Sequence, residues 1–172
     1  GGLGGSISDC VAFAQSFGKH LVVEPFAHAI MFAGAALNAS DSPLAGEWTQ
    51  KLASGEGIAA FAYEEGHGTS SPDMIAMVAE PSGDGFILNG EKRLVIAGAQ
   101  ADAVIVAARV GAGGPVGLFL VEKGADGMAA SDFQTIDGRS AANITFTDAT
   151  ASGDAVLSTK ADDALDRILA NA

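Results

Sequence analysis

An Asn-Gly dipeptide between two apolar runs is the feature that most constrains how this chain can fold. In FILNGEKRLVI, Asn89-Gly90 separates Phe86–Leu88 from Lys92–Ile96. Both central residues of a type I′ turn need positive φ, and Asn and Gly tolerate that conformation better than other residues. The pattern therefore predicts a two-residue hairpin turn at Asn89-Gly90, with an antiparallel strand on either side.

Short apolar runs separated by turn residues continue through the middle of the chain. Turns are predicted at Ser82–Gly85, Gly111–Pro115, Gly124–Gly127 and Asp137-Gly138. Strands are predicted at Ile58–Tyr63, Met74–Ala79, Gly85–Leu88, Lys92–Ile96, Ala103–Arg109, Gly117–Glu122, Met128–Phe133 and Asn143–Thr147. Short strands at this spacing are typical of an antiparallel barrel or sandwich.

Helical periodicity dominates both ends of the chain. Apolar residues three and four apart predict helices from Ile7 to Gly18, from Glu24 to Leu37 and from Pro43 to Ser54, and the period returns after Asp162. The predicted fold class is therefore α+β. It comprises an N-terminal helical segment (1–55), an antiparallel β-barrel middle domain (56–158) and the start of a C-terminal helical domain (159–172).

Charge and composition exclude several classes of function. Nine basic and 21 acidic residues give a net charge of −12, which argues against nucleic acid and anionic membrane surfaces as partners. The longest apolar run, Pro25–Leu37, contains His28 and is too short to span a bilayer. The single Cys10 excludes an intramolecular disulfide, and no His or Cys spacing indicates a metal site. A cytoplasmic location is expected.

The two ends of the sequence predict a fragment of a longer protein. The chain opens on GGLGG without an initiator Met, and it closes on DDALDRILANA, where a helix has only begun.

Five segments, in order, resemble the acyl-CoA dehydrogenase family. They are GGLGGS (1–6), WTQKLASGEGIAAFAYEE (48–65), DGFILNGEKRLVIAGAQAD (84–102), GLFLVEKGADGM (117–128) and ITFTDATASGDAVL (144–157). In addition, GAQAD (98–102) and TIDG…AA (135–142) resemble a divergent branch of the family. That branch includes the small subunits of heteromeric dehydrogenases that act on pimeloyl-CoA-like substrates.

The resemblance implies an enzyme of fatty acid and lipid catabolism. In this family a carboxylate removes the α-proton of an acyl-CoA thioester while a hydride passes to FAD, so the acyl chain becomes α,β-unsaturated. The implied partners are the acyl-CoA substrate and a homologous subunit, within a homo- or heterotetramer. The family carboxylate belongs to a C-terminal helical domain, so no catalytic base is assigned in this chain.

The same resemblance identifies candidate binding residues. A Thr-Glu-Pro loop that holds the flavin edge corresponds to residues 61–70, and an aromatic–Ile–Thr triplet corresponds to residues 94–96. The implied cofactor-binding residues are Phe61, Ala62, Tyr63, Glu64, Ser70, Leu94, Val95 and Ile96, and the implied substrate contacts are His67 and Ser70.

Two of these positions depart from the family pattern. Glu64 stands where the family has a hydrogen-bonding Thr, and Ile96 stands where it has a hydroxyl, so neither side chain donates to flavin. Backbone amides remain possible donors. The alternative reading is a flavin-free subunit that supports a homologous catalytic partner, and a third is a flavin enzyme of this fold with different chemistry.

Other polar residues have structural interpretations. We expect Glu64 and Glu65 in an exposed acidic loop, Lys92 and Arg93 at the solvated end of a strand, and His28 on a helix surface or in the core.

Overall fold

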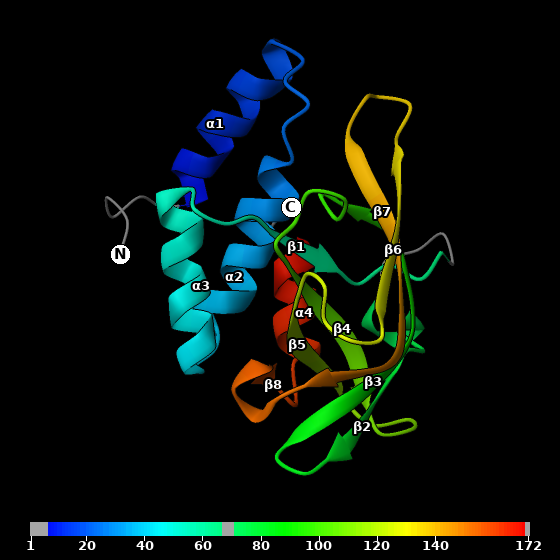
Figure 1. Cartoon of the computed structure of the whole chain (residues 1–172). Coiled ribbons are helices and arrows are strands. Elements are labelled where there is room, and N and C mark those ends of the chain that lie inside the picture. Colours follow the sequence, from blue (N-terminus) through cyan, green and yellow to red (C-terminus); the bar gives the residue numbers. More distant parts are fainter. Residues whose placement is uncertain (1–6, 67–70, 171–172) are drawn as a thin grey trace.

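The computed structural model describes residues 7–66 and 71–170, and it has an α+β architecture in which helices and strands lie on different sides of the molecule (Figure 1). The predicted fold class is confirmed: helices come first, a sheet follows, and a further helix comes last. The helices are α1 (Ile7–Lys19), a π-helical segment (Phe26–Phe32), α2 (Ala33–Asn38), α3 (Pro43–Ser54) and α4 (Asp162–Ala170).

The helix boundaries follow local signals in the sequence. Pro43 occupies the first turn of α3, where its missing N–H costs nothing, and Gly55 ends that helix in the left-handed conformation, with φ +76°. The second predicted helix is continuous in its apolar pattern but changes form midway. Its first half, Phe26–Phe32, is π-helical, and the α-helical form begins at Ala33. π-Helical turns are rare and are often found at functional sites.

Within the described residues, eight strands form the β region. They are β1 (Ala59–Ala62), β2 (Val78–Ser82), β3 (Gly85–Ile96), β4 (Ala103–Val110), β5 (Val116–Glu122), β6 (Met128–Gln134), β7 (Ser140–Ala151) and β8 (Val156–Ser158). The prediction of a strand from Met74 is wrong in its start, because Pro72–Met74 forms a 3₁₀ turn and β2 begins at Val78. The turn predicted at Ser82–Gly85 is confirmed and joins β2 to β3.

The predicted turn at Asn89-Gly90 is wrong. Both residues lie inside β3, which runs unbroken from Gly85 to Ile96 and pairs with β2 on one side and β7 on the other. The register between β3 and β7 shifts between Leu88 and Gly90, so the dipeptide forms a β-bulge. Gly90 has φ +146°, and a Cβ there would lie 2.7 Å from Cγ of Met77. The positive φ that signals a turn is used here to bend a strand.

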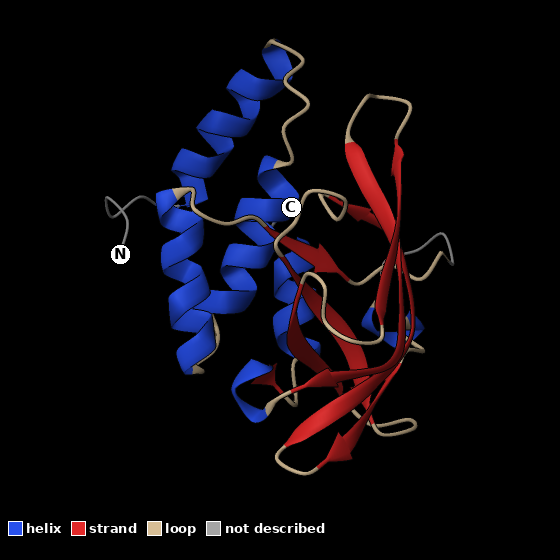
Figure 2. Ribbon diagram, in the orientation of Figure 1, coloured by secondary structure: helices blue, strands red, loops and turns tan. Residues whose placement is uncertain are grey.

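The strands form one curled, open sheet with the order β6-β7-β3-β2-β4-β5-β8, and β1 pairs with β4 beside this path. The sheet is therefore not a closed barrel in its strand pairing. Most pairs are antiparallel, but β1 and β2 both run parallel to β4. Figure 2 shows the strands wrapping around one side and the helices covering the other.

Alternating residues of the central strands face two separate cores. In β4, Ala103, Ile105 and Ala107 pack with the helices, whereas Val104, Val106 and Ala108 face the rest of the sheet. Large members of the helix-side core are Phe32, Leu37, Trp48, Phe61, Leu118 and Leu165. The centre of the sheet is thus buried on both faces, which explains why β4 is apolar throughout rather than alternating.

Candidate functional site

The candidate site lies where the chain leaves β1 on its way to β2. Both strands pair with the same edge of β4: β1 along residues 103–106 and β2 at residues 109–110. Between them the chain leaves the sheet after Ala62 and returns at Val78. On its way out it meets β3, where the N–H of Arg93 donates to the carbonyl oxygen of Glu64 at 2.8 Å.

A small pocket of about 60 Å³ opens where the end of β1 meets β3. Its lining residues are His28, Phe61, Tyr63, Glu64, Arg93, Leu94, Val95 and Ile96. Most of the residues that the sequence indicated for a cofactor edge thus surround one pocket. Ala62 does not, since it is fully buried in the sheet-side core, and His67 and Ser70 lie outside the described residues.

A second bulge in β3 shapes one wall of the pocket. The register with β7 shifts between Lys92 and Val95, and Leu94 between them has φ +51°, a strained conformation for a residue with a side chain. The N–H of Leu94 donates to Oδ1 of Asn143 at 3.0 Å, which stabilises the bend. Leu94 is 48 % exposed, whereas Val95 and Ile96 are buried.

His28 reaches the pocket from the π-helical segment, a position that its sequence context did not indicate. Its ring lies edge-on to Phe32, with centroids 5.1 Å apart. Burial, and then the positive charge of Arg139, lower the pKa of His28 below 6.5, so the ring is neutral at pH 7. No motif in the sequence pairs His28 with residues of β1 and β3. Only the folding of the helices over the sheet brings them together.

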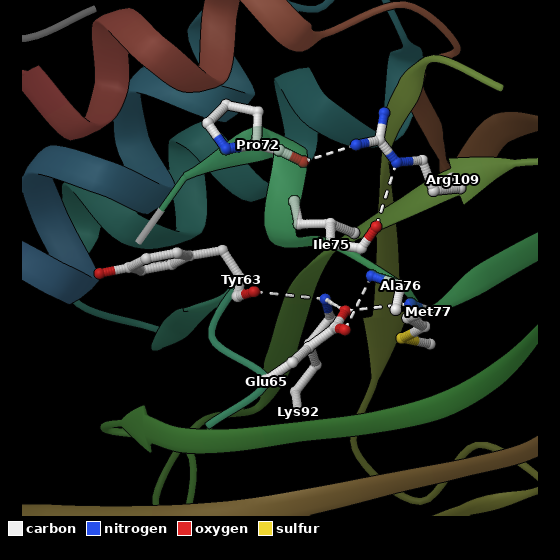
Figure 3. Close-up of polar contacts among 8 residues, drawn as sticks. All are labelled: Tyr63, Glu65, Pro72, Ile75, Ala76, Met77, Lys92 and Arg109. Carbon is white, nitrogen blue, oxygen red and sulfur yellow. Dashed lines mark hydrogen bonds and ion pairs between the residues drawn. The ribbon is translucent and has the colours of Figure 1, made fainter. Parts of the chain in front are cut away.

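Next in sequence to the pocket residues Glu64 and Arg93, Glu65 and Lys92 form a buried ion pair (Figure 3). Nζ of Lys92 lies 2.5 Å from Oε1 of Glu65 and also donates to the carbonyl oxygen of Tyr63 at 3.3 Å. The Glu65 carboxylate accepts two further hydrogen bonds, from the N–H groups of Ala76 at 2.8 Å and Met77 at 3.1 Å. The side chain of Lys92 is fully buried, and that of Glu65 is 8 % exposed.

Both placements correct the sequence-based expectation. Lys92 was expected at the solvated end of a strand and Glu65 in an exposed loop, but they neutralise each other in the interior. Burial lowers the pKa of Lys92 to about 8 despite the attraction of Glu65 and Glu64. Burial raises the pKa of Glu65, but Lys92 and the two amide N–H groups outweigh it and hold the pKa below its usual value. Arg93, the next residue along, is exposed as expected.

Arg109 holds the last part of the chain segment between β1 and β2, just before β2 begins (Figure 3). From β4, its guanidinium donates to the carbonyl oxygens of Pro72 at 2.8 Å and Ile75 at 3.1 Å, and also to Gly114 at 3.1 Å. Its Nη1 lies 3.7 Å from Oδ1 of Asp162, at the start of α4. Sequence reasoning assigned Arg109 no role, because its partners are carbonyl oxygens that leave no side-chain pattern.

The pocket combines apolar walls with a few polar groups, which suits one edge of a planar, partly polar ring system. The residues with polar side chains among those that line it include His28, Arg93 and Glu64, and Nη2 of Arg93 also donates to Oε2 of Glu91 at 3.0 Å. The amide N–H of Arg93 donates to the Glu64 carbonyl oxygen, and the amide N–H of Leu94 donates to Oδ1 of Asn143. These two backbone donors therefore already have hydrogen-bond partners within the chain.

Two other kinds of site are absent from the part of the chain that the structure describes. Residues 7–66 and 71–170 hold no group of three or more His, Cys, Asp or Glu side chains placed to bind a metal ion. Within the same residues, no helix is both long and apolar enough to cross a membrane.

Comparison with known proteins identifies relatives of this chain. The family model described as "Acyl-CoA dehydrogenase, middle domain" matches residues 60–149. Among curated proteins, the mitochondrial isovaleryl-CoA dehydrogenase of Pongo abelii is 37 % identical over 90 residues, covering 49 % of this chain and 21 % of that protein.

Solved structures show the same fold. The ChsE4-ChsE5 complex of Mycobacterium tuberculosis contains a chain that matches with a TM-score of 0.82 and 25 % identity, covering 96 % of this chain and 44 % of that one. A glutaryl-CoA dehydrogenase of Mycobacterium smegmatis in complex with FADH2 matches with a TM-score of 0.72 and 22 % identity, covering 83 % of this chain and 37 % of that one. The chain thus spans about a fifth of the curated relative and less than half of each solved chain.

Proposed function

Because this chain belongs to the acyl-CoA dehydrogenase family, we propose that it forms the cofactor-facing part of a protein that desaturates an acyl-CoA thioester with FAD as the hydride acceptor. The observation that carries the proposal is the single pocket that gathers Phe61, Tyr63 and Glu64 with Leu94–Ile96, the two segments that resemble the flavin-binding motifs of the family.

The lining residues fit the edge of a bound flavin. When bound, FAD supplies the capacity to accept a hydride. Phe61, Val95 and Ile96 would provide apolar walls that exclude water, and His28 and Arg93 would provide N–H donors in place of the hydroxyls that positions 64 and 96 lack. At about 60 Å³ the pocket can hold only part of the cofactor, so the remainder would lie against other surfaces.

Several features of the wider protein are part of the same proposal. We place an N-terminal helical segment at 1–55, the middle domain at 56–158 and the start of a C-terminal helical domain at 159–172. The partner would be a homologous subunit. The similarity of this chain to a chain of the ChsE4-ChsE5 complex supports that choice. Acyl-CoA would be the substrate, lipid catabolism the process and the cytoplasm the location, with the heteromeric pimeloyl-CoA-type enzymes as the family branch.

A specific observation favours a second candidate, a flavin-free subunit that supports a catalytic partner. Glu64 and Ile96 donate no hydrogen bond from their side chains, and the amides of Arg93 and Leu94 are bonded elsewhere in the chain. A pocket with so few available donors would suit a subunit that keeps the fold and the subunit contacts but has lost the cofactor.

The visible absorbance spectrum separates the two candidates. The full-length protein is purified alone and together with a co-expressed homologous subunit, and flavin bands are sought at about 370 and 450 nm. Bands from the protein alone support the dehydrogenase proposal, and bands only from the pair support the second candidate. A colourless protein in both preparations contradicts flavin chemistry at this site.

A matched pair of variants then locates the flavin. His28→Leu keeps an apolar contact with Phe32 but removes the donor, so FAD binding should weaken several-fold. His20→Leu makes the same chemical change at an exposed histidine whose Nδ1 contacts the Ser16 carbonyl oxygen, and it should leave binding unchanged. Equal effects from both variants would place the flavin elsewhere.

A further inference from the structure

The segment between β1 and β2 is tied at both ends to one carboxylate. Glu65 belongs to the outgoing end, just after the pocket residues Tyr63 and Glu64. Ala76 and Met77, whose N–H groups it accepts, belong to the returning end, just before β2. Figure 3 shows these two ends meeting at Glu65 above Lys92 of β3.

Lys92 completes the connection to the sheet. Its ammonium binds the Glu65 carboxylate and the Tyr63 carbonyl oxygen, and the next residue, Arg93, binds the Glu64 carbonyl oxygen through its N–H. Consecutive carbonyl groups of the outgoing end are therefore held by consecutive residues of β3. Tyr63, Glu64 and Arg93 all line the pocket, so these contacts fix part of its wall.

Burying this pair has a cost that packing alone would not require. A buried ion pair gives up the hydration of both charges, and apolar residues of similar volume often stabilise a protein as well or better. Its partners here are backbone groups at two distant points of one segment. The contacts therefore set the positions of the two ends of the segment relative to each other, which an apolar pair could not do.

We propose that Glu65 and Lys92 are positioning residues that clamp the two described ends of the segment between β1 and β2, Tyr63–Glu65 and Ala76–Met77, and thereby hold the pocket wall at Tyr63–Glu64 in place. This inference rests on the proposed function, since the pocket is the proposed cofactor site. Neither residue lines the pocket, so both act on a bound ligand through the backbone that they hold.

Hydrogen exchange tests the clamp without any cofactor. In Lys92→Met, Glu65 loses its counter-ion, so the amides of Ala76, Met77 and Arg93 should exchange about tenfold faster or more. Amides of β4, such as that of Val106, should keep their wild-type rates. The control Lys123→Met removes an exposed lysine that contacts the Ala99 carbonyl oxygen, and it should change none of these amides.

A double variant shows whether the two residues act as one unit. Glu65→Gln alone should also speed exchange at Ala76 and Met77, and Glu65→Gln with Lys92→Met should exchange no faster than the more affected single variant. Additive effects would contradict a shared clamp. Wild-type exchange in Lys92→Met, or equal acceleration throughout β4, would overturn the proposal in favour of no role or of general destabilisation.

Flavin signals then connect the clamp to the pocket. In FAD-loaded protein, Lys92→Met should weaken FAD binding and change the visible circular dichroism of the flavin band, whereas Lys123→Met should do neither. An unchanged flavin spectrum in Lys92→Met would contradict the positioning role. A protein that binds no FAD would contradict the proposed function, while the exchange result would still decide whether the clamp exists.

Discussion

Asn89 and Asp148 bind each other twice across the β3–β7 pair although 59 residues separate them in the sequence. Nδ2 of Asn89 donates to Oδ1 of Asp148 at 3.1 Å, and the N–H of Asp148 donates to Oδ1 of Asn89 at 2.9 Å. Asp148 has φ +51°, so both strands are irregular at this point. The double contact holds the bulge that the Asn-Gly dipeptide creates in β3.

Gly90 should therefore resist substitution. Gly90→Ala places a Cβ 2.7 Å from Cγ of Met77 at a positive φ, and we expect it to lower the free energy of unfolding by about 1–3 kcal/mol. Gly34→Ala, inside α2 with no atom within 4 Å of the new Cβ, should stabilise by about 0.5–1 kcal/mol. Urea unfolding of both variants measures the difference, and equal effects would contradict the close approach of Met77.

Arg109 should contribute more to stability than an exposed arginine. Arg109→Met leaves the carbonyl oxygens of Pro72, Ile75 and Gly114 without their donor, and we expect a loss of about 2–4 kcal/mol. Arg139→Met breaks an exposed ion pair with Asp137, which solvent screens, so its effect should fall within error. Thermal unfolding of the two variants tests this order, and a larger effect at Arg139 would refute it.

Lys92 should make stability depend on alkaline pH. Its pKa is about 8 in the folded protein and 10.5 when unperturbed, because burial outweighs its attraction to Glu65. Between these values the unfolded chain binds more protons than the folded one, so the free energy of unfolding should rise with pH. The rise has an upper limit of about 3 kcal/mol, at ~1.36 kcal/mol per pH unit.

The difference between wild type and Lys92→Met isolates this contribution from other titrating groups. Unfolding free energies measured from pH 7 to 11 should give a difference that increases above about pH 8. A difference that stays constant or falls across this range would show that the pKa of Lys92 is not lowered in the folded protein.

His28 should titrate differently when Arg139 is changed. Burial is the larger cause of its lowered pKa, and the positive charge of Arg139 is the second. Arg139→Gln removes that charge, so the pKa of His28 should rise toward 6.5, as followed by NMR of the ring protons. Lys123→Gln also removes one positive charge, but Lys123 does not contribute to the lowered pKa of His28. This variant should therefore leave the pKa of His28 unchanged.

The sequence by itself determined the family and most of the helices and strands. Helical periodicity before Gly55, short strands after it, and the end of α3 at Ser54 could be predicted because they depend on neighbouring residues. The segments around Phe61 and Leu94 could be matched to a family for the same reason. Such local signals fix φ preferences and apolar periods but say little about which distant residues meet.

Only the tertiary structure decided how those signals were used. Gly90 can take a positive φ whether it turns a chain or bulges a strand, and pairing with β7 selected the bulge. Lys92 has the sequence context of a surface residue. The fold nevertheless buries its side chain and places Glu65 and the Tyr63 carbonyl oxygen beside its ammonium group. A long polar side chain is stable inside a protein only where its partners are supplied, and those partners come from chain segments that no local pattern connects.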